Sequence, residues 1–120
     1  MKKSLTRKER LRGTAALRRV FSVSRGAEPG VVSGRGLRLM AAENGLAYSR
    51  VVVSPVRKYG SAVARNRARR VAKEAYRCIK SSVKPGFDLA FILFPGDFSY
   101  GERLSQFSFL LKKAGLLRED

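Results

Sequence analysis

The stretch from Arg65 to Arg77, RNRARRVAKEAYR, decides how the middle of this 120-residue chain folds. At about 100° per residue around an α-helix, small apolar residues gather in one arc: Ala68, Val71, Ala72, Ala75, Cys78 and Ile79. Polar residues, nearly all of them basic, fill the opposite arc: Asn66, Arg69, Arg70, Lys73, Arg77 and Lys80. The pattern predicts one long helix, capped by Ser61 and ending near Lys80, with its apolar face packed against a sheet.

The opposite face of this helix predicts contact with nucleic acid rather than an ordinary solvated surface. Its one acid, Glu74, stands one turn after Arg70 and is expected to pair with it. The remaining like charges destabilise a helix by a few tenths of a kcal/mol per neighbouring pair, so an anionic partner is expected to relieve them. Arginine grips phosphate through two parallel hydrogen bonds, and Asn66 offers directional bonds to a base edge or a ribose hydroxyl.

The composition of the whole chain agrees with a polyanionic partner. The balance of 26 Lys and Arg against 9 Asp and Glu gives a net charge of +17. Nucleic acid is the first candidate and an anionic membrane surface the second. An apolar fraction of 44% indicates one folded domain over residues 1–120, in which residues 1–12 form a basic, mobile arm. No apolar run is long enough for a transmembrane helix.

Cysteine usage fits a reducing compartment, so a cytoplasmic location is expected. The single cysteine, Cys78, excludes an internal disulfide. The sequence contains no histidine that would activate a thiol nucleophile, so we expect Cys78 to be a small core residue.

Further elements are predicted before the basic helix. Thr14 is expected to cap a short helix that ends near Phe21, and the Gly- and Ser-rich residues 24–36 are expected to form a loop. Alternating residues 37–42 and the β-branched run 48–56 indicate strands, and Asn44-Gly45 between them predicts a hairpin.

After the basic helix, residues 87–94 are almost all apolar, which is typical of a strand covered on both faces. Apolar positions at helical spacing over residues 104–114 predict a final amphipathic helix, and Pro55 marks an edge or a break. The fold class is therefore an α/β (α+β) sandwich of order α-β-β-α-β-α, with room for one further short strand.

The basic helix resembles the signature of the protein component of bacterial ribonuclease P. The matching positions are Arg65, Asn66, Arg67, Arg69, Arg70, Lys73 and Glu74. Upstream, Arg50-Val51 followed by Arg57-Lys58-Tyr59-Gly60 keeps the family's spacing, so the specific pattern spans residues 50–77. Looser agreement extends to residues 17–21, 87–94 and 101–114. The chain departs from the family pattern at Leu17, Val52 and Val56.

This resemblance implies a small subunit that joins a catalytic RNA and promotes removal of the 5′ leader of precursor tRNA. The implied RNA-binding residues are Arg57, Lys58, Arg65, Asn66, Arg67, Arg69, Arg70, Lys73 and Arg77. A cleft for the single-stranded leader is implied at Phe21, Tyr48 and Val56. Magnesium is expected to be held mainly by the RNA, with no membrane and no obligatory protein partner. The resemblance also implies a left-handed crossover around the basic helix, opposite to the general preference.

The residues themselves give no sign of a protein-borne active site. Without histidine, a nuclease needs clustered carboxylates, but Glu43, Glu74, Asp88 and Asp97 fall on different predicted elements. Catalysis is therefore expected in the RNA. The alternative function is a basic ribosomal or ribosome-assembly RNA-binding protein with no role in cleavage. A membrane-surface module would need an apolar helix face free to insert, and small residues suit packing on a sheet better.

Overall fold

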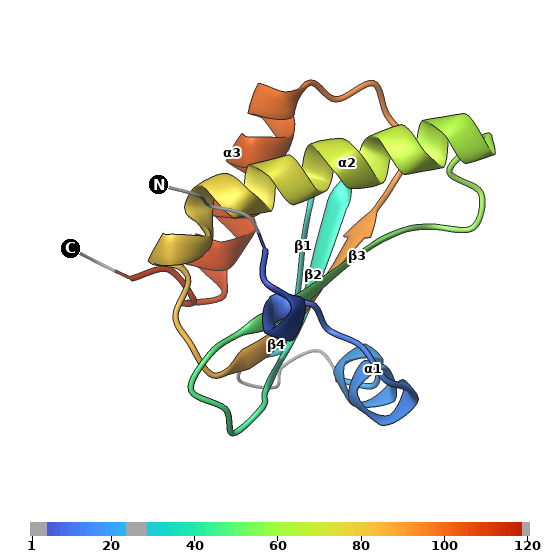
Figure 1. Ribbon diagram of the computed structural model, residues 1–120. Coiled ribbons are helices and arrows are strands. Elements are labelled where there is room, and N and C mark those ends of the chain that lie inside the picture. Colours follow the sequence, from blue (N-terminus) through green and yellow to red (C-terminus); the bar gives the residue numbers. More distant parts are fainter. Residues whose placement is uncertain (1–4, 24–28, 119–120) are drawn as a thin grey trace.

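The computed structural model describes residues 5–23 and 29–118, and it contains a four-stranded sheet between two helical layers (Figure 1). The strands lie in the spatial order β1 (Val31–Gly34), β2 (Leu37–Glu43), β4 (Phe87–Leu93) and β3 (Arg50–Pro55). Helix α1 (Thr14–Phe21) covers one face, and α2 (Ala62–Ile79) and α3 (Tyr100–Lys113) cover the other. Short 3₁₀ turns lie at Arg7–Glu9 and Lys80–Ser82. The predicted α+β sandwich is confirmed, and β1 is its further short strand.

The predicted hairpin at Asn44-Gly45 is wrong, because β2 and β3 do not pair with each other. Strand β4 lies between them, antiparallel to β2 and parallel to β3. The tight hairpin instead joins β1 to β2 through Arg35-Gly36, where Gly36 has a φ of +70°. Asn44 closes a longer loop: its Oδ1 accepts from the Leu46 N–H at 2.8 Å. Local turn chemistry therefore predicts a turn correctly here but does not select the strand that pairs.

The parallel strands β3 and β4 are joined through α2, as a crossover requires. The edge position of β3, which ends at Pro55, agrees with the prediction for that proline. The left hand that the resemblance implies for this crossover stays a prediction.

Strand β4 is the centre of the core. Residues 88–91 and 93 are buried, as predicted for a strand covered on both faces. Helix α2 lies on the sheet through its buried residues, which are Ala68, Ala72, Ala75 and Tyr76. The Tyr76 ring packs 5.9 Å from that of Phe91, which in turn stacks on Phe107 of α3 at 4.2 Å. Three small alanines bring the helix close, and aromatic rings fill the space that remains.

The ends of the helices follow local capping rules, with one exception. The Ser61 side chain accepts from the Ala64 N–H at 3.1 Å, so the predicted cap of α2 is confirmed. Ser99 and Glu102 form a reciprocal capping box at the start of α3. Thr14 is not a cap: it is the first residue of α1, and Gly13, with a φ of +93°, occupies the cap position. Among the described residues, no helix meets the length and hydropathy that a membrane span requires.

The basic segment at the N-terminus is part of the packed domain from Leu5 onward. Leu11 is buried, and its N–H donates to the Val51 carbonyl at 2.8 Å. Lys80 donates to Glu9 at 2.9 Å and so links this segment to the end of α2. The prediction of a mobile arm over residues 1–12 is therefore wrong for residues 5–12, and residues 1–4 lie outside the described part.

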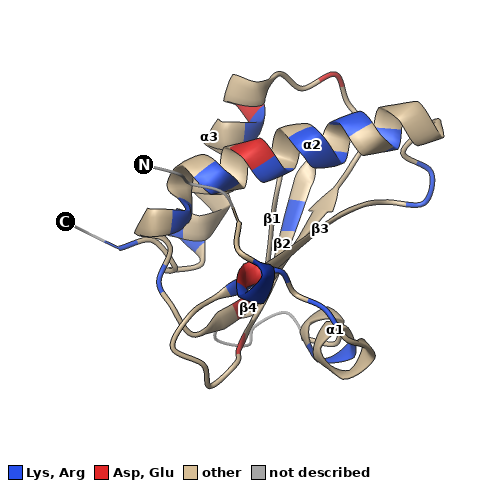
Figure 2. Cartoon of the chain, in the orientation of Figure 1, with Lys and Arg blue, Asp and Glu red and all other residues tan. Residues whose placement is uncertain are grey.

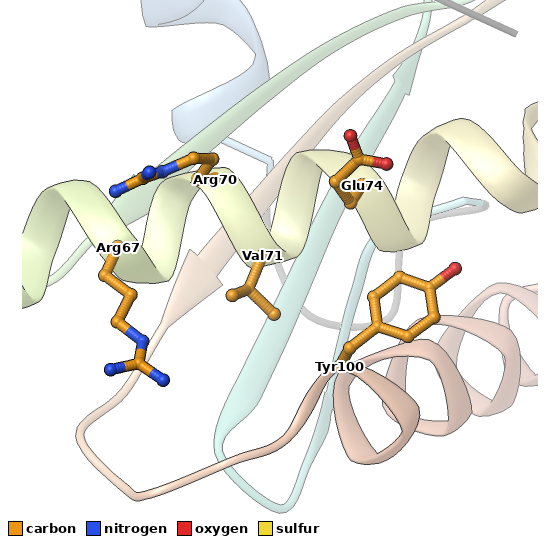
Figure 3. Close-up of a pocket in the computed structure, with 5 residues that line it drawn as sticks. All are labelled: Arg67, Arg70, Val71, Glu74 and Tyr100. Atoms are coloured by element: carbon orange, nitrogen blue, oxygen red, sulfur yellow. The ribbon is translucent and has the colours of Figure 1, made fainter.

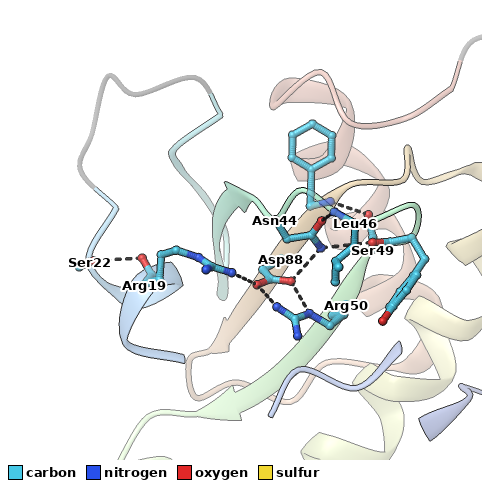
Figure 4. Close-up of polar contacts among 9 residues, drawn as sticks. Arg19, Ser22, Asn44, Leu46, Ser49, Arg50 and Asp88 are labelled. Atoms are coloured by element: carbon cyan, nitrogen blue, oxygen red, sulfur yellow. Dashed lines mark hydrogen bonds and ion pairs between the residues drawn. The ribbon is translucent and has the colours of Figure 1, made fainter. Parts of the chain in front are cut away.

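Asp88 anchors α1 to the other face of the sheet (Figure 4). Its side chain is fully buried and accepts two hydrogen bonds from Arg50, at 2.8 and 2.7 Å. Arg19 of α1 donates at 2.9 Å and Asn44 at 3.0 Å. Burial by itself raises the pKa of Asp88, but the hydrogen bonds from Arg50, Asn44 and Arg19 together hold the pKa below its usual value. The charged carboxylate therefore stabilises the fold.

Replacing Asp88 with Asn should lower the free energy of unfolding by about 3 kcal/mol, because Arg50 and Arg19 lose the charge they surround. Urea denaturation at pH 7 measures this loss. Asp97→Asn is the matched control, since Asp97 is exposed and should change stability by less than about 0.5 kcal/mol.

The stability difference between wild type and Asp88→Asn should depend on pH. Because the folded-state pKa of Asp88 lies below the unfolded value of about 3.9, its contribution is fully present above that pH and is lost as the pH falls through the folded value. The gap between wild type and Asp88→Asn should therefore shrink toward pH 2. A gap that stays constant from pH 6 to pH 2 would show that the Asp88 charge does not stabilise the fold.

Candidate nucleic-acid interface

The outward face of α2 carries the cations that the sequence predicted, and Figure 2 shows basic residues recurring along the helix with one acid among them. Arg67, Arg70 and Lys73 are exposed. Within the described residues, none of the three has a hydrogen bond or an ion pair to a protein acceptor. Like charges held three residues apart without a counter-charge cost free energy, so this face is a candidate site for an anion.

Two arginines of the predicted set, Arg65 and Arg69, instead make hydrogen bonds within the protein. Half-buried Arg65 donates to the Arg57 carbonyl at 2.9 Å and ties the loop before α2 to the helix. Arg69 is also half-buried and donates to Asn66 Oδ1 at 3.1 Å, which leaves the Asn66 amide nitrogen free to donate outward. The predicted residues thus divide into cations that point to solvent and arginines that position them. In the loop itself, the side chains of Arg57 and Lys58 are exposed beside the start of α2.

Glu74 does not pair with Arg70, which corrects the sequence prediction. Its carboxylate accepts from both Nε and Nη2 of Arg77, the residue three positions later. An acid that precedes its cation in a helix pairs better than one that follows it, in keeping with the helix dipole. Hydrogen bonding to Glu74, followed by its charge, raises the pKa of Arg77. Arg70 therefore has no counter-charge among the described residues.

Cys78 is exposed, so its predicted place in the core is wrong. The buried stripe of α2 is centred on Ala72 and Tyr76, and Cys78 lies at its edge, where α3 begins. There its Sγ is 2.7 Å from the Tyr100 hydroxyl. This hydrogen bond is the main reason that the pKa of Tyr100 is raised. The thiol therefore helps to fix the orientation of an exposed aromatic ring beside the basic face.

The three residues predicted for a leader cleft are spread over the α1 side of the molecule. Phe21 ends α1 and is 40% exposed. Tyr48 lies before β3 with Lys8 Nζ 4.8 Å from its ring centroid, and Val56 follows β3. Tyr48 and Val56 lie beyond opposite ends of the six-residue strand β3. All three residues remain candidates for contacts along an extended surface.

Sequence reasoning missed Arg38 and Phe94 on this same surface. The Arg38 guanidinium lies 5.3 Å from the centroid of the Phe94 ring. Its buried Nε has no acceptor among the described residues. Arg38 also lies beside Ile92 in the register of β2 and β4. The sequence did contain a signal for the position of Arg38. In the alternation Leu37-Arg38-Leu39, the leucines are buried on one face of the strand, so Arg38 lies on the other face.

Four of the acids in the described ranges are bound to protein groups, while Glu43 and Asp97 are exposed. Asp88 is held by Arg50, Glu74 by Arg77 and Glu9 by Lys80. Glu102 caps α3 through the Ser99 N–H. In the described ranges, no three His, Cys, Asp or Glu residues lie close enough together to hold a metal ion.

The sequence model of the family Ribonuclease P matches residues 5–115. The ribonuclease P protein component of Clostridium botulinum (strain Langeland) is 39% identical over 87 residues, which are 70% of this chain and 78% of that protein. The component of Clostridioides difficile is 54% identical over 46 residues, which are 38% of this chain and 40% of that protein. The chain thus spans about two fifths of the Clostridioides difficile relative.

Solved structures agree in fold. The RNase P protein of Staphylococcus aureus has a TM-score of 0.76 at 21% identity, covering 92% of this chain and 98% of that one. The RNase P protein of Thermotoga maritima has a TM-score of 0.73 at 24% identity, covering 88% of this chain and 96% of that one. At these identities the likeness concerns the arrangement of helices and strands.

Proposed function

Because the chain belongs to the ribonuclease P protein family, we propose that it is the protein subunit of a ribonuclease P that removes the 5′ leader of precursor tRNA. The observation that carries this proposal is the exposed, unneutralised stripe of Arg67, Arg70 and Lys73 on α2. Phosphates of the RNA subunit would supply the missing counter-charges, and binding would release their condensed cations. Arg57 and Lys58 extend the basic surface into the loop before α2, and Arg65 holds that loop in place.

In this proposal the RNA cuts and the protein binds. The acids Asp88, Glu74, Glu9 and Glu102 are engaged in contacts that stabilise the fold, which supports a role for the chain outside the chemical step. Magnesium ions are proposed to be held chiefly by RNA phosphates. The protein would increase affinity for the RNA and for the substrate. A cytoplasmic location accords with the exposed free thiol of Cys78.

The leader is proposed to follow the sheet on the α1 side. There the exposed ring of Phe21 and the Arg38–Phe94 stack offer flat surfaces on which bases can stack. The positive charge of the Arg38 guanidinium can pair with a phosphate of the leader. Tyr48 with Lys8 lies at one end of β3 and Val56 at the other, so these residues would contact different nucleotides.

Cleavage of precursor tRNA by a bacterial ribonuclease P RNA at low magnesium tests the proposal directly. Adding this chain should stimulate release of the 5′ leader, and the chain alone should release none. Absence of stimulation with RNA subunits of several classes would overturn the proposal. Tight binding to ribosomal RNA in that case would favour the ribosome-assembly alternative.

The triple variant Arg67→Ala, Arg70→Ala, Lys73→Ala should bind ribonuclease P RNA more weakly and with a smaller dependence on salt. The slope of log affinity against log salt should fall by about one for each phosphate that the variant no longer neutralises. The control removes the same charge from other elements, through Lys84→Ala, Lys112→Ala and Arg118→Ala. Equal slopes for the two triple variants would show that α2 does not face the phosphates.

Phe21→Ala and Arg38→Ala should each weaken binding of precursor tRNA to the assembled ribonucleoprotein about fivefold or more, and leave binding of mature tRNA unchanged. Loss of stacking affects only a substrate that has a leader. Phe109→Ala, an exposed aromatic on the opposite layer, is the control for Phe21. Similar losses for precursor and mature tRNA would argue against a leader surface on the α1 side.

A further inference from the structure

We propose that the groove between α2 and the start of α3 holds an unstacked base of the RNA partner, and that Tyr100 is the residue on which this base stacks. The inference rests on the proposed function for the identity of the RNA. It adds an RNA-contacting residue from outside the basic helix and its preceding loop. It also gives a role to an exposed aromatic ring that the fold does not require.

The groove lies along one stripe of α2. Arg67, Arg70, Val71 and Glu74 recur at spacings of three and four residues, so they share one side of the helix. With Tyr100 they line a pocket of about 480 Å³, a size typical of sites for small ligands. In Figure 3 the Tyr100 ring rises from α3 toward α2, with Val71 and then Arg67 along the same side of the helix. The floor is apolar and the margin is cationic.

A second pocket continues the groove toward the beginning of α2. It shares Arg67, Val71 and Tyr100 with the first and adds the aromatic residues Tyr59 and Phe98. Its volume is about 660 Å³. The groove therefore continues from the middle of α2 toward its beginning, beside the Tyr100 ring.

The orientation of the Tyr100 ring is fixed by its neighbours. It is 42% exposed, and its hydroxyl lies 2.7 Å from Cys78 Sγ. The capping box of Ser99 and Glu102 fixes the backbone on both sides of Tyr100. A rigid aromatic ring loses little conformational entropy when it stacks on another ring, so its exposed area contributes efficiently to binding.

The charges around the groove favour a nucleotide over an apolar protein segment. Arg67 and Arg70 have no acceptor among the described residues, and an apolar segment would bury them without one. A base stacked on Tyr100 brings a phosphate on each side and supplies those acceptors. Glu74, the acid of the first pocket, is paired with Arg77, and the second acid of the groove, Asp97, lies in the second pocket together with Arg67 and Arg103.

The test is the affinity of a bacterial ribonuclease P RNA for Tyr100→Ala, measured by filter binding across a range of salt concentrations. Affinity should fall about tenfold, because a stacked base contributes on the order of that factor. The salt slope should stay at the wild-type value, because tyrosine carries no charge. Tyr100→Phe keeps the ring without the hydroxyl and should lose much less affinity than Tyr100→Ala, which separates stacking from the contact with Cys78.

Phe109→Ala is the matched control, because Phe109 is also an exposed aromatic on α3 and lies outside this groove. It should bind like wild type. If Tyr100→Ala does not fold, Tyr100→Leu keeps apolar packing without an aromatic ring and should show the same loss. Wild-type binding by Tyr100→Ala or Tyr100→Leu, or an equal loss in Tyr100→Phe, would overturn the inference and leave the proposed function intact. Failure of wild type itself to bind the RNA would instead remove the proposed function.

Discussion

Burial of β4 on both faces is the constraint from which the other features of this structure follow. Because Leu89, Phe91 and Leu93 need cover on one side and Ala90 on the other, the strand takes the centre of the sheet. Strands β2 and β3 are then separated, and α2 must cross over to join β3 to a parallel neighbour. Helices α2 and α3 share one layer, and α1 is left alone on the other. Two surfaces of different chemistry follow from this single placement.

The outward face of α2 carries more positive charge than its acids neutralise. Glu74 neutralises only Arg77 on that helix, while Asp88 and Glu9 serve contacts elsewhere. The buried side of α2 consists of alanines and Tyr76. Its packing on the sheet must offset the repulsion among the cations on the outward face. Within the cationic set, Arg65 and Arg69 direct their hydrogen bonds to the protein. This division keeps Arg67, Arg70 and Lys73 at a defined spacing, as recognition of a folded polyanion requires.

The α1 layer has a different character, because a buried ion-pair cluster holds its helix to the sheet. Asp88 gathers Arg50, Arg19 and Asn44, and the carboxylate fixes α1 against the sheet. Beyond α1 the sheet presents the Arg38 guanidinium over the ring of Phe94. A surface of this kind suits unpaired bases, and the α2 face suits phosphates. The sheet thus separates a surface for the proposed RNA subunit from one for the proposed leader.

Residue order alone was enough to predict the elements whose signals are local. Ser61 and the 3.6-residue period defined α2, and the apolar run at 87–94 identified a strand buried on both faces. The cationic face and the family signature at 50–77 were readable in the same way. Pairing between distant segments could not be predicted from the sequence. An Asn44-Gly45 turn does not specify its strand partner, and the neighbour of Cys78 is Tyr100, 22 positions away. Strand order, the Arg38–Phe94 stack and the α2–α3 groove depend on contacts between distant residues, and such contacts follow from packing the whole core at once.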